Sequence, residues 1–206
     1  TMAQIEKLLD DGVNVMDARA SVTDEAKIQE LIAEIQKSDA PLGGVVHGAM
    51  VINDLDIIDL DQEGFDKVVH PKMLGAWILH NATQDIDLEF FVSFSSFSTV
   101  MGAVRQSNYN AGNAFLDAIS QHRNSLGQAG LTFNWGALKG AGFVQRNEKT
   151  EQYLELLGLS TYDMPETLSV FGRFLPRDAR NVACSRIDWS SLSRFAHLIT
   201  SKTYSY

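Results

Sequence analysis

Residues 90–96 read Phe-Phe-Val-Ser-Phe-Ser-Ser, and after a helical stretch from about Ser107 to about Arg123 the chain continues as Leu131-Thr132-Phe133-Asn134-Trp135. The first and last of these segments are short and apolar, which is typical of buried strands. Because a long helix separates them, they predict a βαβ unit and therefore a parallel sheet.

The same alternation extends in both directions along the chain. Apolar spacing predicts helices over residues 2–9, 24–37, 61–82, 149–157 and 165–174, and strands over 13–16, 45–47 and 181–187. The sequence therefore predicts one α/β domain over residues 1–206, a Rossmann-like parallel sheet with helices on both faces. Ligands of such sheets bind beyond the carboxyl ends of the strands, here residues 17–24, 47–54, 95–108 and 136–146.

Composition excludes several classes of function. The chain has 17 Lys and Arg against 26 Asp and Glu, a net charge of −9, so we expect no nucleic-acid partner and no anionic membrane surface. The longest stretch without a charged residue, 90–104, is too short to span a bilayer, and residues 1–11 do not resemble a signal peptide, which predicts a cytoplasmic location. One cysteine and five histidines without ligand spacing predict no metal site.

Lys72 interrupts an otherwise apolar helix face. Phe65, Val68, Ala76 and Leu79 share that face by their i, i+3 and i+4 spacing. Two interpretations are open. The lysine stem covers apolar surface while its amine reaches water, or the amine points into a polar site between the helix and the sheet.

Two further groups are ambiguous by themselves. Ser95-Ser96-Phe97-Ser98-Thr99 places hydroxyls at a strand's carboxyl end, where a substrate oxygen could bind, yet serine clusters are also ordinary loop composition. Tyr109 and Asn113 are four residues apart and share a helix face. A purely structural interpretation is also open, in which Tyr109 packs against its helix and Asn113 faces water.

Taken together, these positions resemble the ketoreductase domain of type I polyketide synthases and related fatty acid synthases, a branch of the short-chain dehydrogenase/reductase superfamily. In typical members of the superfamily a lysine follows the tyrosine by four residues, whereas this branch has asparagine there and takes its lysine from the earlier helix, as Asn113 and Lys72 do here. The matching segments are Val45-Val46-His47-Gly48-Ala49, Phe65-Asp66-Lys67-Val68-Val69-His70-Pro71-Lys72, Gly75-Ala76-Trp77, Phe90-Phe91-Val92-Ser93-Phe94-Ser95-Ser96, Asn108-Tyr109-Asn110-Ala111-Gly112-Asn113-Ala114-Phe115-Leu116-Asp117 and Asn134-Trp135-Gly136.

The resemblance implies a catalytic set of Tyr109, Ser96, Lys72 and Asn113. Reducing a ketone builds negative charge on the carbonyl oxygen, which must be stabilised and then protonated. Tyr109 would donate the proton, and the charge of Lys72 is expected to lower the tyrosine's pKa from about 10. Ser96 would donate a hydrogen bond to the carbonyl oxygen, and Asn113 would orient Lys72 or a water.

The resemblance also implies a nicotinamide cofactor, with NADPH expected for the family. Lys72 and Tyr109 would hold its ribose, and Ser21, Val22, Gly48, Ala49 and Met50 would line the remainder of its site. Two of these positions depart from the family, which usually has aspartate where Ser21 stands and glycine where Met50 stands. We expect altered cofactor affinity, because Met50 crowds the ribose position and Ser21 lacks the carboxylate's charge.

Substrate and stereochemical control are implied for Asp54, Met101 and Phe143. Ile52-Asn53-Asp54 keeps only the last residue of the Leu-Asp-Asp triplet of B-type members, while Met101 replaces the tryptophan of A-type members. The balance favours a B-type product. An aspartate that simply begins a loop or helix is the alternative for Asp54. Residues 140–175 are expected to form a lid and substrate loop, with Phe143 near the acyl chain.

No Gly-x-Gly-x-x-Gly occurs among the 15 glycines, although the superfamily begins with a strand, a glycine-rich turn and a helix. We therefore expect the first two strands to be absent from this chain and a missing N-terminal segment of the same domain to complete the sheet. A chain shortened by processing would look the same.

The expected activity is NADPH-dependent reduction of a β-ketoacyl thioester, presented on an acyl carrier protein, to the β-hydroxyacyl thioester, beside other domains of a polyketide synthase. Two alternatives remain. One is a non-catalytic, structural ketoreductase-like domain, which would be expected to lack the tyrosine or the lysine. The other is a free-standing short-chain dehydrogenase.

Overall fold

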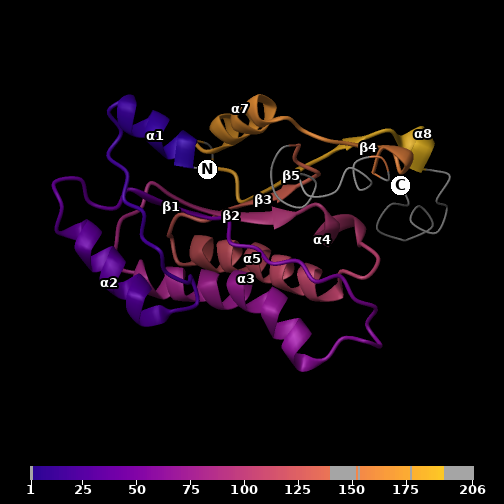
Figure 1. Cartoon of the computed structure of the whole chain (residues 1–206), viewed down its shortest axis with the longest axis horizontal. Coiled ribbons are helices and arrows are strands. Elements are labelled where there is room, and N and C mark those ends of the chain that lie inside the picture. The colour runs from indigo at the N-terminus through magenta and orange to yellow at the C-terminus, as the bar shows by residue number, and fades with distance from the viewer. Residues whose placement is uncertain (1, 140–151, 153, 177, 193–206) are drawn as a thin grey trace.

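A four-stranded parallel sheet forms the centre of the molecule (Figure 1). The computed structural model describes residues 2–139, 152, 154–176 and 178–192. Strands β2 (Phe90–Ser96) and β3 (Leu131–Trp135) pair in parallel from Val92 opposite Leu131 to Ser96 opposite Trp135. Strand β1 (Gly44–His47) adds to the outer edge of β2 and β5 (Asn181–Cys184) to that of β3, so the order is β1-β2-β3-β5. The predicted parallel sheet is confirmed.

Helices cover both faces of this sheet (Figure 1). Helices α3 (Gln62–Ala82) and α5 (Ser107–Ser125) pack side by side on one face, and α2 (Glu25–Gln36) packs against α3. Helices α1 (Met2–Asp10) and α7 (Met164–Phe174) lie on the other face. Asp24 and Asp61 start α2 and α3 by accepting backbone N–H groups of the first turn, as N-caps do. None of the described helices is long and apolar enough to cross a membrane.

The main core lies between the sheet and α7. Val92 and Phe133 are fully buried, and Phe171 and Phe174 of α7 pack against the cluster that they form with neighbouring strands. The Phe133 and Trp135 rings stack with their centroids 4.8 Å apart. In β3 the apolar Leu131, Phe133 and Trp135 belong to this cluster, while Thr132 and Asn134 alternate with them and are buried on the opposite face of the sheet.

Two predicted strands differ from the structure. Residues 13–16 are irregular, so the strand predicted there is wrong; no strand in the described part of the chain pairs with the outer edge of β1, and an extended segment without a partner forms no ladder. The strand predicted over residues 181–187 is two short strands, because the chain leaves the main sheet at Ser185. Its second part, β6 (Arg186–Ile187), pairs antiparallel with β4 (Leu159–Ser160).

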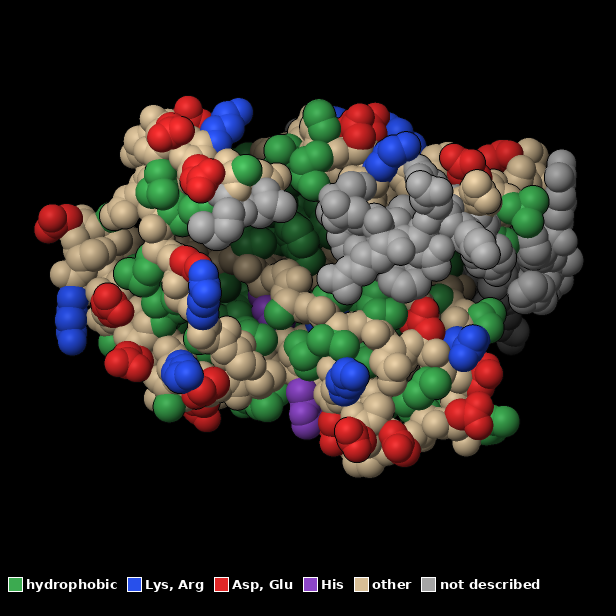
Figure 2. Space-filling view, in the orientation of Figure 1, with side chains coloured by type: hydrophobic (Ala, Val, Ile, Leu, Met, Phe, Trp, Pro, Cys, Tyr) green, Lys and Arg blue, Asp and Glu red, His purple; other side chains and the backbone are tan. Residues whose placement is uncertain are grey.

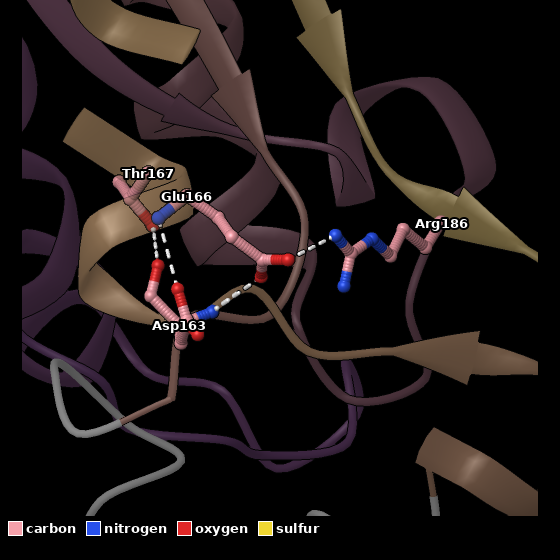
Figure 3. A network of polar contacts seen from close by, with 4 residues as sticks. All are labelled: Asp163, Glu166, Thr167 and Arg186. Carbon is pink, nitrogen blue, oxygen red and sulfur yellow. Dashed lines mark hydrogen bonds and ion pairs between the residues drawn. The ribbon is translucent and has the colours of Figure 1, made fainter. Parts of the chain in front are cut away.

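A polar network fixes the segment around β4 and α7 (Figure 3). Asp163 and Glu166 form a reciprocal capping box at the start of α7, and Arg186 of β6 donates to the Glu166 carboxylate. Thr167 adds a bond to the Asp163 carbonyl. Two short helices complete the described structure, α4 (Ser98–Met101) and α8 (Trp189–Leu192). Of the helix predicted over residues 149–157, residues 152 and 154–156 are helical, while residues 149–151 and 153, and also Phe143, lie outside the described residues.

Candidate active site

Helices α3 and α5 pack side by side next to the carboxyl end of β2. Gly112 of α5 faces Lys72 of α3, and a Cβ atom at Gly112 would lie 3.4 Å from both Cβ and Cδ of the lysine. The lysine stem therefore packs against the backbone of α5 at Gly112, at a distance where an added Cβ would still be in van der Waals contact. This packing brings residues from three separate segments together.

The Lys72 amine is buried and does not reach water. The residue is 2% exposed, its Nζ donates to the Phe94 carbonyl oxygen at 2.9 Å, and it lies 5.3 Å from the centroid of the Tyr109 ring. Of the two interpretations of this lysine, the inward-pointing amine is correct. Burial lowers the pKa of Lys72 from 10.5 to about 8, while the negative charge of Asp117 acts in the opposite direction.

Tyr109 is buried at the first turn of α5, and its hydroxyl lies 3.7 Å from the sulfur of Met50. Burial raises the pKa of Tyr109 above 10.0, and the side chains of Asn113 and Ser96 oppose this rise only in part. The expectation that Lys72 lowers this pKa is therefore wrong for this structure. The ammonium is bound to the Phe94 carbonyl and lies over the ring, so it does not pair with the phenolic oxygen.

Asn113 is fully buried, so the interpretation of a water-facing amide is wrong. Its Nδ2 donates to the Tyr109 carbonyl oxygen at 2.9 Å, one turn back along α5. Its Oδ1 is buried without a hydrogen-bond partner among the described residues. A buried acceptor without a donor is unfavourable, which marks this oxygen as the place for a donor from a bound molecule or a water.

The hydroxyl cluster after β2 is ordered by its own hydrogen bonds. Ser96 Oγ accepts the Ser98 backbone N–H at 3.2 Å and lies 2.9 Å from Ser98 Oγ. The Ser98 hydroxyl also contacts Asn110 Oδ1 of α5 at 2.6 Å, and Thr99 donates to the Ser96 carbonyl at 2.8 Å. These bonds tie α4 to α5 and keep Ser96 beside Tyr109.

The predicted cofactor positions line the neighbouring loops. Ser21 Oγ lies 2.7 Å from Thr23 Oγ1 in the loop before α2, and Val22 packs on α3 where Gly75 leaves space. Gly48 and Ala49 follow β1, and a Cβ at Gly48 would meet nothing closer than 3.9 Å, so a ligand can approach this backbone. A nicotinamide ribose fits the buried Lys72 donor and the unpartnered Asn113 oxygen, while Met50 narrows the approach to the Tyr109 hydroxyl.

Of the residues predicted for stereochemical control, Asp54 lies on a loop and Met101 is the last residue of α4. Both carboxylate oxygens of Asp54 accept from Gln106 Nε2 at 3.2 Å, and Asn108 Nδ2 donates to the Asn53 carbonyl at 3.1 Å. Asp54 therefore tethers its loop to the start of α5 and does not begin a helix; Asp61 caps α3 instead.

Two polar residues beside this site, Asp117 and Asn134, were given no role from the sequence, and they bond to Ser95 of the hydroxyl cluster. Asp117, Asn134 and Ser95 form a buried or partly buried network directly behind Lys72. Asp117 follows Asn113 by one helical turn and Asn134 breaks an apolar strand, and both features are visible in the sequence. Their contact across α5, β2 and β3 is not.

The fold is that of the ketoreductases of the short-chain dehydrogenase/reductase type, and it brings the predicted lysine, tyrosine, serine and asparagine together. A family model described as the KR domain matches residues 1–140, and the chain therefore belongs to the ketoreductase domains of polyketide synthases.

Solved ketoreductases share this fold closely. The ketoreductase from the first module of phoslactomycin biosynthesis in Streptomyces sp. HK803 has 29% identity and a TM-score of 0.92, and the match covers 98% of this chain and 47% of that one. A structure of A-type ketoreductases from a modular polyketide synthase has 32% identity and a TM-score of 0.86, covering 94% of this chain and 40% of that one.

A sequence relative is a type I phenolphthiocerol synthesis polyketide synthase, Pks1, of Mycobacterium tuberculosis, which its name describes provisionally as inactive. It is 31% identical over 187 residues, which are 90% of this chain and 12% of that protein. The chain thus spans less than half of the solved ketoreductase structures and a small part of the relative.

Proposed function

We propose that this chain supplies the catalytic part of a reductase that converts a β-ketoacyl thioester on an acyl carrier protein into the β-hydroxyacyl thioester. The observation that carries the proposal is the buried Lys72 amine 5.3 Å from the centroid of the Tyr109 ring, on helices that belong to different segments of the chain. A buried ammonium is costly, and an apolar residue would pack this helix face without that cost.

The proposed step begins with the ketone oxygen held between the hydroxyls of Ser96 and Tyr109. Because burial raises its pKa, Tyr109 carries its proton at neutral pH and can donate it to the oxygen as negative charge develops there. Lys72, whose pKa is about 8, is still mostly protonated at pH 7 and supplies a positive charge 5.3 Å from the centroid of the tyrosine ring. A bound nicotinamide supplies the hydride.

Asn113 is the fourth residue of the proposed site, and its contribution follows from how its amide is held. Its amide is anchored through Nδ2 on the Tyr109 carbonyl, which leaves the buried Oδ1 to accept from the Lys72 ammonium or from a water that returns the proton to Tyr109. Lys72 has donor hydrogens beyond the one directed at Phe94, since an ammonium has three. Lys72 and Tyr109 would also hold the cofactor ribose.

NADPH and a completing N-terminal segment belong to the same proposal. Two observations support this segment. Within the described sheet no strand pairs with the outer edge of β1. In addition, a recess with hydrophobic side chains lies between α1 and α7, on the sheet face opposite α3 and α5 (Figure 2). We place the protein in the cytoplasm as part of a synthase with further domains. Of the proposed lid and substrate region, residues 140–151 and 153 lie outside the described residues, while α7 packs against the main core. The Asp54 loop and Met101 support a B-type product.

The test is NADPH oxidation by the intact gene product with a β-ketoacyl thioester, compared with Tyr109→Phe. Ser125→Ala is the matched control, because it removes a hydroxyl at the far end of the same helix, where it bonds only locally. We expect turnover in the parent and the control and its collapse in Tyr109→Phe. A folded parent without turnover, on NADPH or NADH, overturns the proposal and favours a structural domain.

A further inference from the structure

Asp117 lies on α5 one turn beyond Asn113 and two turns beyond Tyr109, so the three side chains share the helix face that meets the sheet. Its side chain is partly buried, and among the described residues no Lys, Arg or His lies within ion-pair distance of it. Both carboxylate oxygens instead accept from Nδ2 of Asn134, each at 3.0 Å. A carboxylate withdrawn from water in this way is stable only where its oxygens are bound.

Asn134 connects this carboxylate to the hydroxyls at the end of β2. Its Nδ2 also lies 3.0 Å from Ser95 Oγ and 2.9 Å from Thr99 Oγ1, while its Oδ1 has no partner among the described residues. Turning the amide round would place Oδ1 against the carboxylate and against two hydroxyls that already donate elsewhere, Ser95 to the Asn113 carbonyl and Thr99 to the Ser96 carbonyl. The carboxylate of Asp117, together with these hydroxyls, therefore determines which way the Asn134 amide faces.

The bonds continue from Asn134 to the backbone that binds Lys72. Ser95 lies opposite Asn134 in the sheet, and its hydroxyl donates to the Asn113 carbonyl at 3.3 Å. The residue before it, Phe94, provides the carbonyl that accepts from Lys72 Nζ. The chain of contacts thus joins Asp117, through β3 and β2, to the ends of α5 and β2 that carry the proposed catalytic groups.

The charge of Asp117 also connects this network to Lys72. The titratable groups that face Lys72 in the described structure are Tyr109 and Asp117 of α5 and His47 of β1, while β2 contributes the Phe94 carbonyl. Burial lowers the pKa of His47 to about 4, so this imidazole is neutral at pH 7. Asp117 is consequently the negative charge that favours the protonated form of Lys72.

We propose that Asp117 is a positioning residue for the reduction: through Asn134 and Ser95 it holds the end of β2, with the Phe94 carbonyl that binds Lys72, in register with α5. This inference rests on the proposed function and assigns to the network behind the site a role that packing alone does not require.

The experiment compares Asp117→Asn with the parent in the intact gene product, measuring kcat, KM and the pH dependence of kcat for ketone reduction. Asp85→Asn is the matched control, since Asp85 is exposed beyond the end of α3. We expect Asp117→Asn to lower kcat by up to about 100-fold, the loss that a misplacement of about 1 Å produces, with little change in KM. The fall of kcat at alkaline pH should begin at a lower pH than in the parent.

Exchange of the two partners, Asp117→Asn with Asn134→Asp, restores a carboxylate–amide pair with the charge on β3. We expect it to recover part of kcat and of the thermal stability. If Asp117→Asn lowers only thermal stability and leaves both kcat and its pH dependence as in Asp85→Asn, the network is structural and the inference is overturned. A parent without ketone reduction would instead refute the proposed function.

Discussion

The sulfur of Met50 lies 3.7 Å from the hydroxyl of Tyr109, so the group proposed to protonate the substrate already has a contact in this structure. Met50 follows β1, at a position where the resemblance to ketoreductases leads us to expect glycine. Its side chain is partly exposed, which means that it can swing away without leaving a hole in the core. The methionine therefore competes with a ligand for the space beside the tyrosine.

We expect Met50→Gly to lower the KM for NADPH several-fold and to change kcat little, because the substitution opens the ribose position and frees the Tyr109 hydroxyl. Met50→Leu separates the two causes, since leucine keeps the volume but removes the sulfur acceptor. Steady-state kinetics with varied cofactor measures the effect. A KM that rises in the glycine variant would show that Met50 supports cofactor binding and does not obstruct it.

The buried Lys72 makes stability depend on pH in a defined direction. With a folded pKa of about 8 against 10.5 for the free side chain, the unfolded chain holds a proton between these values that the folded chain lacks. The free energy of unfolding contributed by Lys72 therefore rises as the pH increases from about 8 to about 10.5, by about 3 kcal/mol in total.

Lys72→Met should be more stable than the parent at pH 7.5 and should lose this rise, because it removes the buried charge. Urea unfolding at pH 7.5 and pH 10 measures both effects. Lys67→Met, at an exposed position of the same helix, is the control and should keep the parent's pH dependence. Identical pH dependence in all three proteins would contradict the assigned burial of the amine.

Gly75 sets the distance between α3 and the loop that carries Ser21 and Val22. A Cβ atom at Gly75 would lie 2.7 Å from Val22 Cγ1 and 3.3 Å from His47 Cε1, both on short, packed side chains. We expect Gly75→Ala to lower the free energy of unfolding by about 1–3 kcal/mol, since overpacking outweighs the better helix propensity of alanine. Displacement of Val22 should also weaken cofactor binding.

Gly172→Ala provides the contrast, because a Cβ at this position of α7 meets nothing within 4 Å. Alanine should there stabilise the helix by up to about 1 kcal/mol. Thermal unfolding of the two variants beside the parent measures the difference. If Gly75→Ala is stabilised as much as Gly172→Ala, the proposed steric limit at the Val22 loop does not exist.

Local pattern predicted most of the fold. Apolar runs such as Phe90–Phe94 and helical spacing in residues 61–82 are properties of neighbouring residues, and both elements occur as expected. The strand predicted over residues 13–16 failed because a strand also needs a hydrogen-bonded neighbour, which no local pattern encodes. The break at Ser185 is likewise decided by which sheet each half of the segment can join.

For the site, the sequence by itself determined which side chains are present and, through their order, the family. It already marked Lys72 as a charge on an apolar face and Asn113 as the partner of Tyr109. Only the tertiary structure decided that the amine turns inward to Phe94, that burial raises the pKa of Tyr109, and that Asp117 and Asn134 stand behind Lys72. Burial, pKa and hydrogen bonding depend on which distant segments exclude water from a side chain, and that is settled only when α3, α5 and the sheet pack together.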